Sequence, residues 1–302
     1  MKKELSATVI KTTTLSAVPS GSALEMVNDR VYIISDDARY IYQFVEETSL
    51  LRDSIRLVHL ADKDGRISKP LKPDYEGAIS AKVLGKDCLI AFGSGSLRPQ
   101  RDSALLVSVD TGFQKVVALE ALYAAMRKEA GISDKDFNIE AAALYENRLL
   151  LINRGSNHVF SMDWTLTLKH LLEAAPVPSI SAFSITLPKT DDYPTGISGA
   201  CFLNARQVLF SASAEATTNW IADGEVLGSY IGVLKLDEAG KPQLQGIAPV
   251  LTEAGKPVKD KVEGISTYGP EENGVLTLLC IVDNDDGTSR LLHVRIDELP
   301  LP

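Results

Sequence analysis

The apolar and polar residues of this chain recur in one order, which repeats five times along the sequence. Each unit opens on Glu or Ser and passes through small residues to a polar turn. It then enters a run rich in β-branched and aromatic residues that ends in polar residues. The units begin at Ser22, Glu76, Glu140, Ser198 and Glu263. Successive starts lie roughly 60 residues apart, and a regular interval of this kind is typical of a repeat architecture.

Each interval holds further runs with the composition of β-strands. The first unit continues through YIYQFVEE and SIRLVHL, whereas only LLHVRID follows the last unit. The N-terminal run ATVIKTTTL can supply the missing outer strand, and such a closure removes exposed sheet edges. The pattern therefore predicts an all-β, five-bladed β-propeller with four antiparallel strands per blade. In this arrangement the N-terminal strand closes the last blade by pairing with residues 291–296.

The chain reads as a single domain over residues 1–302, because no linker or change of composition divides it. Helix formers throughout LEALYAAMRKEAGI, followed by a Gly stop, predict one inserted helix near residues 119–130. LKHLLEAA predicts a shorter second one. Six blades remain an alternative, because an interval of about 60 residues is long enough to hide another unit.

The composition narrows the class of protein. Apolar residues make up 45% and charged residues 24%, as in ordinary folded proteins. The net charge of −9 argues against nucleic acid as a partner, and no apolar run is long enough to cross a membrane. The three cysteines are far apart, so neither a disulfide framework nor a zinc site is indicated. The N-terminal residues lack the apolar core of a signal peptide, so we expect a cytoplasmic protein, although a trimmed signal would look the same.

The repeat predicts where chemistry would lie. Innermost strands begin, and second strands end, at the same face of a propeller. The five unit starts should therefore ring one mouth of the channel. A wider ring should hold the ends of the second strands, which carry Asp36, Asp37, Ser94, Ser96, Arg154, Glu215, Asp283, Asn284 and Asp285.

The three glutamates of the inner ring require either protonation or a cation, because carboxylates a few Å apart repel one another. A ring made only of oxygen donors suits calcium, which accepts six to eight oxygens in loose geometry. No His or Cys belongs to the ring, which argues against zinc, copper and iron. The alternative is that these glutamates cap strands or pair with Lys261 and Arg154.

Several motifs follow one another along the chain in a fixed order. SALEMVNDRVYIISDDARYIYQF comes first, then the predicted helix that leads into IEAAALYENRLLLINRG, and then GISGACF, SASAE, GSYIGVLKLD and KVEGI. These motifs resemble, in the same order, those of the apyrases, a family of soluble calcium-activated nucleotidases that are five-bladed propellers. The resemblance implies that Ser22, Glu76, Glu140, Ser198 and Glu263 hold one calcium ion.

Two of the chain's departures from the family concern charged side chains. The family's Asp-Leu-Asp-x-x-Ser-Arg strand lies near its N-terminus, whereas here Asp283, Asn284, Asp285 and Ser289-Arg290 follow the last unit start. This reads as the same blade closed at a different point. The family's Arg-Arg pair is Arg154-Gly155 in this chain.

Two functions follow from these residues. The first is a calcium-dependent phosphohydrolase acting on a nucleotide or another phosphorylated small molecule. In it Arg154 would hold a phosphate oxygen, and one of Asp36, Glu215, Asp283 and Asp285 would orient the water. The second is a non-catalytic propeller with a structural calcium that binds a small ligand or a protein partner. A glycosidase that uses two of the acids is a third possibility.

Overall fold

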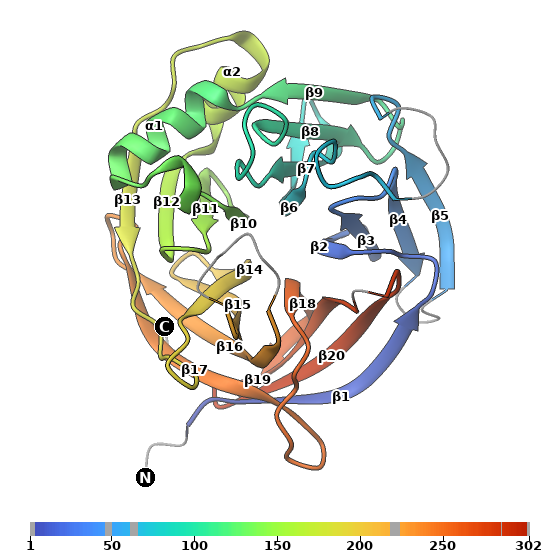
Figure 1. Cartoon of the computed structure of the whole chain (residues 1–302), viewed down its shortest axis with the longest axis vertical. Helices are drawn as coiled ribbons and strands as arrows, with labels where there is room; N and C mark the ends of the chain where they lie inside the picture. Colours follow the sequence, from blue (N-terminus) through green and yellow to red (C-terminus); the bar gives the residue numbers. More distant parts are fainter. Residues whose placement is uncertain (1–3, 46–49, 61–65, 218–223, 285, 301–302) are drawn as a thin grey trace.

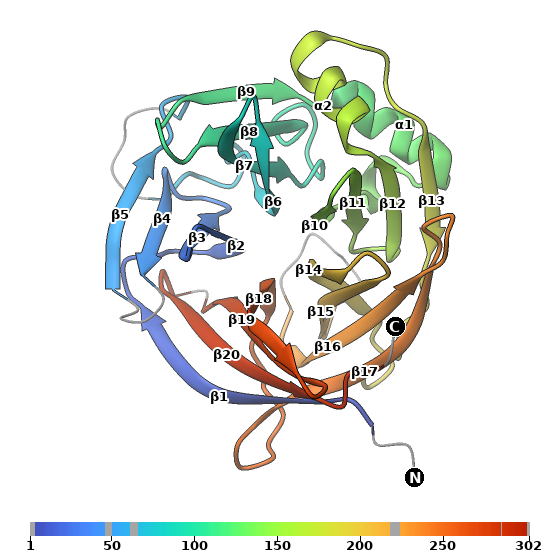
Figure 2. The same cartoon turned by 180° about the vertical axis from the view of Figure 1, so that it is seen from behind.

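The computed structural model describes residues 4–45, 50–60, 66–217, 224–284 and 286–300 of the chain. It is an all-β structure whose sheets stand around a common centre like the blades of a propeller (Figures 1 and 2). The all-β class predicted from the sequence is confirmed.

Three sheets are four-stranded, antiparallel and ordered as in the sequence. The first contains β2 (Gly21–Val27), β3 (Arg30–Ser35), β4 (Tyr40–Val45) and β5 (Leu50–Arg56). The second contains β6 (Tyr75–Val83), β7 (Lys86–Gly93), β8 (Ser103–Ser108) and β9 (Gln114–Ala118). The third contains β10 (Ile139–Tyr145), β11 (Arg148–Asn153), β12 (His158–Asp163) and β13 (Ile180–Ser184).

The remaining strands form one sheet of eight, in the order β14-β15-β16-β17-β1-β20-β19-β18. These strands are β14 (Thr195–Asn204), β15 (Gln207–Glu215), β16 (Val226–Leu236), β17 (Pro242–Thr252), β18 (Val262–Glu272), β19 (Val275–Asp283), β20 (Ser289–Asp297) and β1 (Ser6–Leu15). β1 pairs antiparallel with β20, from Ala7 opposite Ile296 to Thr13 opposite Leu291 and beyond. The expected pairing of the N-terminal strand with residues 291–296 is therefore confirmed. The other edge of β1 pairs in parallel with β17 over three residue pairs, and this contact joins the two halves of the eight-stranded sheet.

The core lies between neighbouring sheets. Successive side chains of β7 point to opposite faces, as in any strand. Ile90 and Phe92 enter the cluster shared with the third sheet, whereas Leu89 and Ala91 enter the cluster shared with the first. A strand buried on both faces reads as a continuous apolar run, which explains the segment CLIAF.

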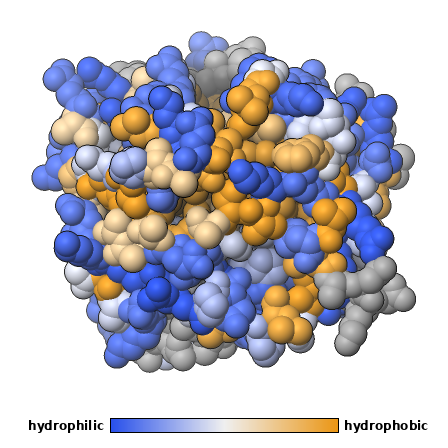
Figure 3. Space-filling model, turned by 90° about the horizontal axis from the view of Figure 1, so that it is seen from above, coloured by the Kyte–Doolittle hydropathy of each residue, from blue (hydrophilic) through white to orange (hydrophobic). Residues whose placement is uncertain are grey.

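Two α-helices lie on the rim beside β9 and β13 (Figures 1 and 2). α1 (Glu120–Ala130) confirms the helix predicted near residues 119–130, and it ends at Gly131 with a φ of 64°. α2 (Trp164–Glu173) begins earlier than the segment LKHLLEAA suggested, because Asp163 caps it by accepting a hydrogen bond from the Leu166 amide. A single 3₁₀ turn covers Asp134–Asp136. Figure 3 views the molecule from this side, where apolar side chains gather in the middle of the rim between polar ones. None of the described helices is long and apolar enough to cross a membrane.

The five innermost strands β2, β6, β10, β14 and β18 contact one another in turn around the centre (Figure 1). Glycine permits this close approach. A Cβ on Gly264 would lie 2.8 Å from the Cα of Ala23, and a Cβ on Gly199 would overlap the carbonyl oxygen of Glu263. The small residues that follow each unit start in the sequence are therefore required by contacts between inner strands.

Replacing Gly199 by alanine is expected to lower the free energy of unfolding by about 3 kcal/mol, because backbone atoms of the adjacent inner strand cannot move aside. Gly228 is the matched control, because a Cβ there meets its nearest atom, the Tyr230 hydroxyl, at 3.6 Å. Its replacement by alanine should leave stability unchanged or raise it by about 0.5 kcal/mol. Urea denaturation measures both variants, and equal effects would contradict the packing role given to Gly199.

Candidate functional site

A cavity of about 390 Å³ lies where the innermost strands begin. Four of the five unit starts line it, together with residues that end second strands or lie in the connections between sheets. Its polar and charged lining residues are Ser20, Ser22, Asp36, Asp37, Arg66, Ser68, Lys69, Lys72, Asp74, Glu76, Ser96, Arg101, Asn138, Glu140, Glu215, Lys261, Glu263 and Asp283.

Each unit start lies at an irregularity of its innermost strand. The pairing of β6 with β7 skips Glu76, since Tyr75 lies opposite Gly93 and Gly77 lies opposite Phe92. The same register shift spans the unit start in β2, β10, β14 and β18. A β-bulge leaves its extra residue unpaired and re-aims its side chain. Five equivalent bulges thus mark the five positions that the repeat singled out.

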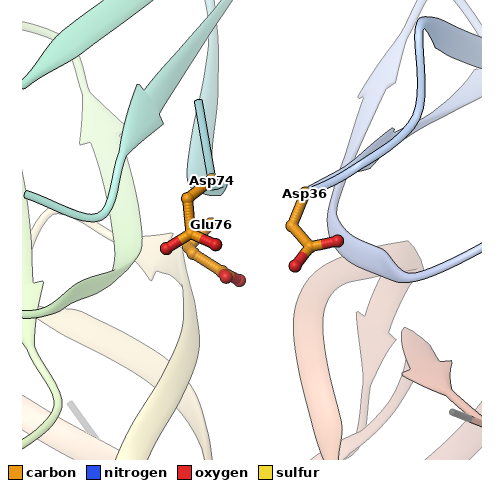
Figure 4. Close-up of side chains that lie close together, drawn as sticks. All are labelled: Asp36, Asp74 and Glu76. Atoms are coloured by element: carbon orange, nitrogen blue, oxygen red, sulfur yellow. The ribbon is translucent and has the colours of Figure 1, made fainter. Parts of the chain in front are cut away.

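On one side of the cavity lie Asp36, Asp74 and Glu76, with one carboxylate oxygen from each within 4.8 Å of the others. Figure 4 shows Asp36 facing Asp74 and Glu76 across the space between two sheets. The ammonium of Lys72 contacts Asp36 and lies 2.7 Å from Asp74 Oδ1, and Arg101 Nη1 lies 2.6 Å from Asp74 Oδ2. We call these five residues the Asp74 cluster.

On the other side lie Glu140, Glu215 and Glu263 with two basic residues. Arg154 donates through Nη1 to Glu140 at 2.7 Å and through Nη2 to Glu215 at 2.5 Å. Lys261 lies 2.8 Å from Glu263 and about 4 Å from the other two carboxylates. We call these five residues the Glu140 cluster.

Each cluster contains three carboxylates and two cationic side chains, so each has one more acid than base. In the Asp74 cluster the excess falls on Glu76, whose carboxylate has no hydrogen bond or ion pair to any described residue. Burial raises the pKa of Glu76 well above the usual carboxyl value, and the nearby Asp74, Asp36, Glu140 and Glu263 raise it further.

Two further carboxyl groups of the cavity also have raised pKa values. Burial raises the pKa of Glu263 to about 8, although Lys261 opposes the shift. Burial likewise raises the pKa of Asp36 to about 6, against the attraction of Lys72. The Oδ1 atom of Asp36 is buried and has no hydrogen-bond partner. Burial, rather than a missing cationic neighbour, is the largest cause of both shifts.

Of the five residues expected to hold calcium, the structure places four in the cavity lining and one outside it. Glu76, Glu140 and Glu263 line the cavity and belong to the two clusters, and Ser22 lines it while donating to the Ser20 carbonyl at 3.1 Å. Ser198 is outside the cavity lining, and its hydroxyl donates to the Val262 carbonyl at 2.5 Å.

Among the residues expected to act in catalysis, Asp36, Glu215 and Asp283 line the cavity. Arg154 is 3% exposed and lies behind the lining, held by Glu140 and Glu215. It is therefore not placed to hold a phosphate oxygen as expected. The alternative in which glutamates of the ring pair with Lys261 and Arg154 is what the structure shows for Glu140 and Glu263. Asp285 lies outside the described residues.

Sequence reasoning missed Asp74, Lys72 and Arg66. Asp74 has a φ of 58° and stands just before β6, where the turn aims its carboxylate at the cavity. Arg66 pairs with Asp37 at 2.5 Å. The spacing Asp74-x-Glu76 was the one signal for these three residues, because Lys72 and Arg66 lie in a connecting segment that the repeat does not include.

A narrow passage of about 10 Å³ shares Glu76 and Glu140 with the large cavity and reaches Glu25 on β2. Its remaining lining consists of small and apolar residues of the innermost strands. The passage has room for about one water molecule. Burial raises the pKa of Glu25 to about 7, against hydrogen bonds to Ser80.

This raised pKa predicts a pH dependence of stability. The folded protein retains the Glu25 proton that the unfolded chain loses, so stability falls as the pH rises from about 4.5 through about 7. When the pH is raised from 5 to 8, the free energy of unfolding should fall in the wild-type chain. The fall should be smaller by about 1–2 kcal/mol in Glu25→Gln, because glutamine does not ionise. Urea denaturation at the two pH values measures the difference, and parallel losses in both chains would contradict a shifted Glu25.

The sequence profile described as a family of unknown function (DUF6929) matches residues 17–296. The chain belongs to this family. No curated protein matches it significantly.

Several solved structures are similar to this DUF6929 chain. Glutaminyl cyclase from Myxococcus xanthus is 10% identical, with 98% of this chain and 99% of that chain covered and a TM-score of 0.52. The major allergen Mala s 1 of Malassezia sympodialis is 9% identical over 94% and 95% of the two chains, with a TM-score of 0.47. A luciferin-regenerating enzyme is 11% identical over 97% and 95%, with a TM-score of 0.45. At these identities the likeness to the glutaminyl cyclase shows the fold alone.

The comparisons do not support the resemblance to apyrases. The profile that matches residues 17–296 is that of DUF6929. The resemblance implied a propeller-like all-β fold, and the structure has such a fold. The apyrase motifs were short, and those at the unit starts lie where contacts between inner strands require small residues.

Proposed function

We propose that this DUF6929 chain is a five-bladed propeller that binds one divalent cation in its central cavity and, beside it, an anionic small molecule. The blade count follows from dividing the eight-stranded sheet where β17 meets β1, which leaves five sets of four strands. Calcium is the first candidate cation, because every donor is an oxygen and calcium tolerates irregular coordination.

The observation that carries the proposal is the Asp74 cluster. Three carboxylates from two sheets bring oxygens within 4.8 Å of one another. One of these groups, Glu76, has no partner among the described residues, and Asp36 Oδ1 is buried and unpaired. Because each cluster has one carboxylate in excess, a single ion of charge +2 would neutralise both excesses. The residues present therefore fit a divalent cation, which Asp36, Asp74 and Glu76 would hold.

This assignment differs from the set implied by the apyrase resemblance. Only Glu76 is common to both. Glu140 and Glu263 already have cationic partners, and the hydroxyls of Ser22 and Ser198 donate to backbone carbonyls. Ser22, Glu140 and Glu263 would shape the cavity around the ion, whereas Ser198 lies outside its lining.

The cavity also offers groups for an anionic ligand. Arg66 and Lys69 line it next to the Asp74 cluster, and Arg66 is half exposed. Guanidinium and ammonium groups beside a divalent cation are the usual environment of a bound phosphate. A phosphorylated small molecule is therefore the ligand class that we propose.

Hydrolysis of that ligand is the second candidate function, and the position of Asp283 favours it. Asp283 lines the same cavity, so its carboxylate is placed to accept a proton from an attacking water. A bound cation supplies charge stabilisation to the phosphoryl oxygens. The alternative is a non-catalytic propeller that binds its ligand or a protein partner around a structural calcium.

Phosphate release from nucleotides and simple phosphomonoesters, measured with calcium and with chelator, separates these functions. Calcium-dependent release that Glu76→Gln abolishes and the exposed control Glu253→Gln retains would support the hydrolase. Calcium binding without release from any phosphoester would leave the binding function. Absence of calcium binding would contradict the proposal as a whole.

A further inference from the structure

The Asp74 cluster already contains a cation that belongs to the chain. The Lys72 ammonium contacts Asp36 and lies 2.7 Å from Asp74 Oδ1. These are two of the three carboxylates that would hold a divalent ion. An ammonium and a metal ion cannot occupy the same point between the two groups, because like charges at that distance repel strongly.

We propose that Lys72 is a built-in competitor that the divalent cation must displace, so that this residue sets the affinity and the charge selectivity of the site. The inference rests on the proposed cation site. A tethered ammonium has a high local concentration and neutralises Asp36 and Asp74 as well as a monovalent ion would. Only an ion of higher charge that also binds Glu76 gains enough binding free energy to replace the Lys72 ammonium.

The position of Lys72 in the chain determines where its ammonium lies after a cation displaces it. Lys72 ends the segment 66–72, which lines the cavity, and its amide donates to the Ser68 carbonyl at 3.0 Å. The other end of the segment is fastened by the pair of Arg66 with Asp37. The displaced ammonium therefore remains inside the cavity, where it can pair with an anionic ligand. Calcium and the anion should then bind with positive cooperativity, each raising the affinity for the other.

Calorimetric titration of the intact chain with calcium tests this role. Lys72→Met should bind calcium about tenfold or more tightly than the wild type, because a positive charge next to the ion has been removed. Lys261→Met removes a cation from the Glu140 cluster of the same cavity and should have a smaller effect. Lys82→Met, which removes an exposed charge from β6 outside the cavity, should leave the affinity unchanged.

The outcomes separate the two proposals. If the wild type binds calcium and Lys72→Met binds it equally or more weakly, the competitor role is wrong while the cation site stands. If neither chain binds calcium, the cation site itself is wrong. Binding by Lys72→Met alone would overturn both proposals for the wild-type chain, because calcium would then fail to displace the ammonium.

A measurement on the wild-type chain keeps the inference testable if Lys72→Met does not fold. The side-chain ¹⁵N resonance of Lys72, assigned with Lys72→Arg, should shift when calcium is added and shift again when inorganic phosphate follows. A bound calcium that leaves this resonance unchanged would overturn the inference.

Discussion

Replacing Arg154 by methionine is expected to lower the free energy of unfolding by about 3–5 kcal/mol, the usual cost of removing one partner from a buried ion pair. Arg154 is 3% exposed and pairs with Glu140 at 2.7 Å and Glu215 at 2.5 Å. Without the guanidinium, Lys261 alone would face the three carboxylates of the Glu140 cluster. Urea denaturation at pH 7 measures the loss.

The size of this effect follows from the position of the residue. Arg154 follows β11 in the third sheet, whereas Glu215 ends β15 in the eight-stranded sheet. Its Nη2 also donates to Ser213 at 3.2 Å. The guanidinium thus joins two neighbouring sheets at the cavity and holds their acidic side chains in place.

Arg206→Met is the matched control. Arg206 is 60% exposed and lies 4.0 Å from the exposed Glu238. An exposed pair of this kind contributes little, so the variant should lose less than about 0.5 kcal/mol. A loss below about 1 kcal/mol in Arg154→Met would mean that the Glu140 cluster does not hold the two sheets together.

Replacing Glu76 by glutamine is expected to act in opposite directions on stability and on calcium binding. Without calcium, the variant should be more stable than the wild type by about 1–3 kcal/mol at pH 8, because it removes a charge with no partner from a poorly solvated position. With calcium, affinity should fall by about 100-fold or more, since even residues that only orient a metal ligand change affinity by about 10–100-fold.

The pH dependence gives this prediction a second readout. The pKa of Glu76 is raised above that of the unfolded chain, so its ionisation lowers stability progressively as the pH rises above about 4.5. The stability gained by Glu76→Gln should therefore be larger at pH 8 than at pH 5. Glu253→Gln makes the same change of charge at an exposed position and should show neither effect. A Glu76→Gln chain that is less stable than the wild type at pH 8 would show that the carboxylate has a stabilising partner.

The architecture could be predicted because its causes are local and repeated. Strands buried on both faces appear as apolar runs, and contacts between inner strands impose small residues after each unit start, as Gly199 and Gly264 illustrate. The pairing of the N-terminal strand with β20 followed from counting strands. The parallel contact of β1 with β17 had no such signal, because it depends on how two sheets meet at their edges.

The candidate site could be predicted only in part. The repeat identified Glu76, Glu140 and Glu263, because each is the bulged residue at the start of an innermost strand. It could not show that the basic side chains of Arg154 and Lys261 satisfy two of them. Asp74 and Lys72 lie in a connecting segment without periodicity, and their approach to Asp36 arises from the arrangement of two sheets.

The central claim is that the cavity binds one divalent cation at Asp36, Asp74 and Glu76. Calorimetric titration of the chelator-treated chain with calcium tests it most directly, with the double variant Asp36→Asn/Glu76→Gln titrated in parallel. The account predicts one ion per wild-type chain, a higher melting temperature with calcium, and neither effect in the double variant. A wild-type chain that gives no binding heat and melts at the same temperature with calcium and with chelator would contradict it.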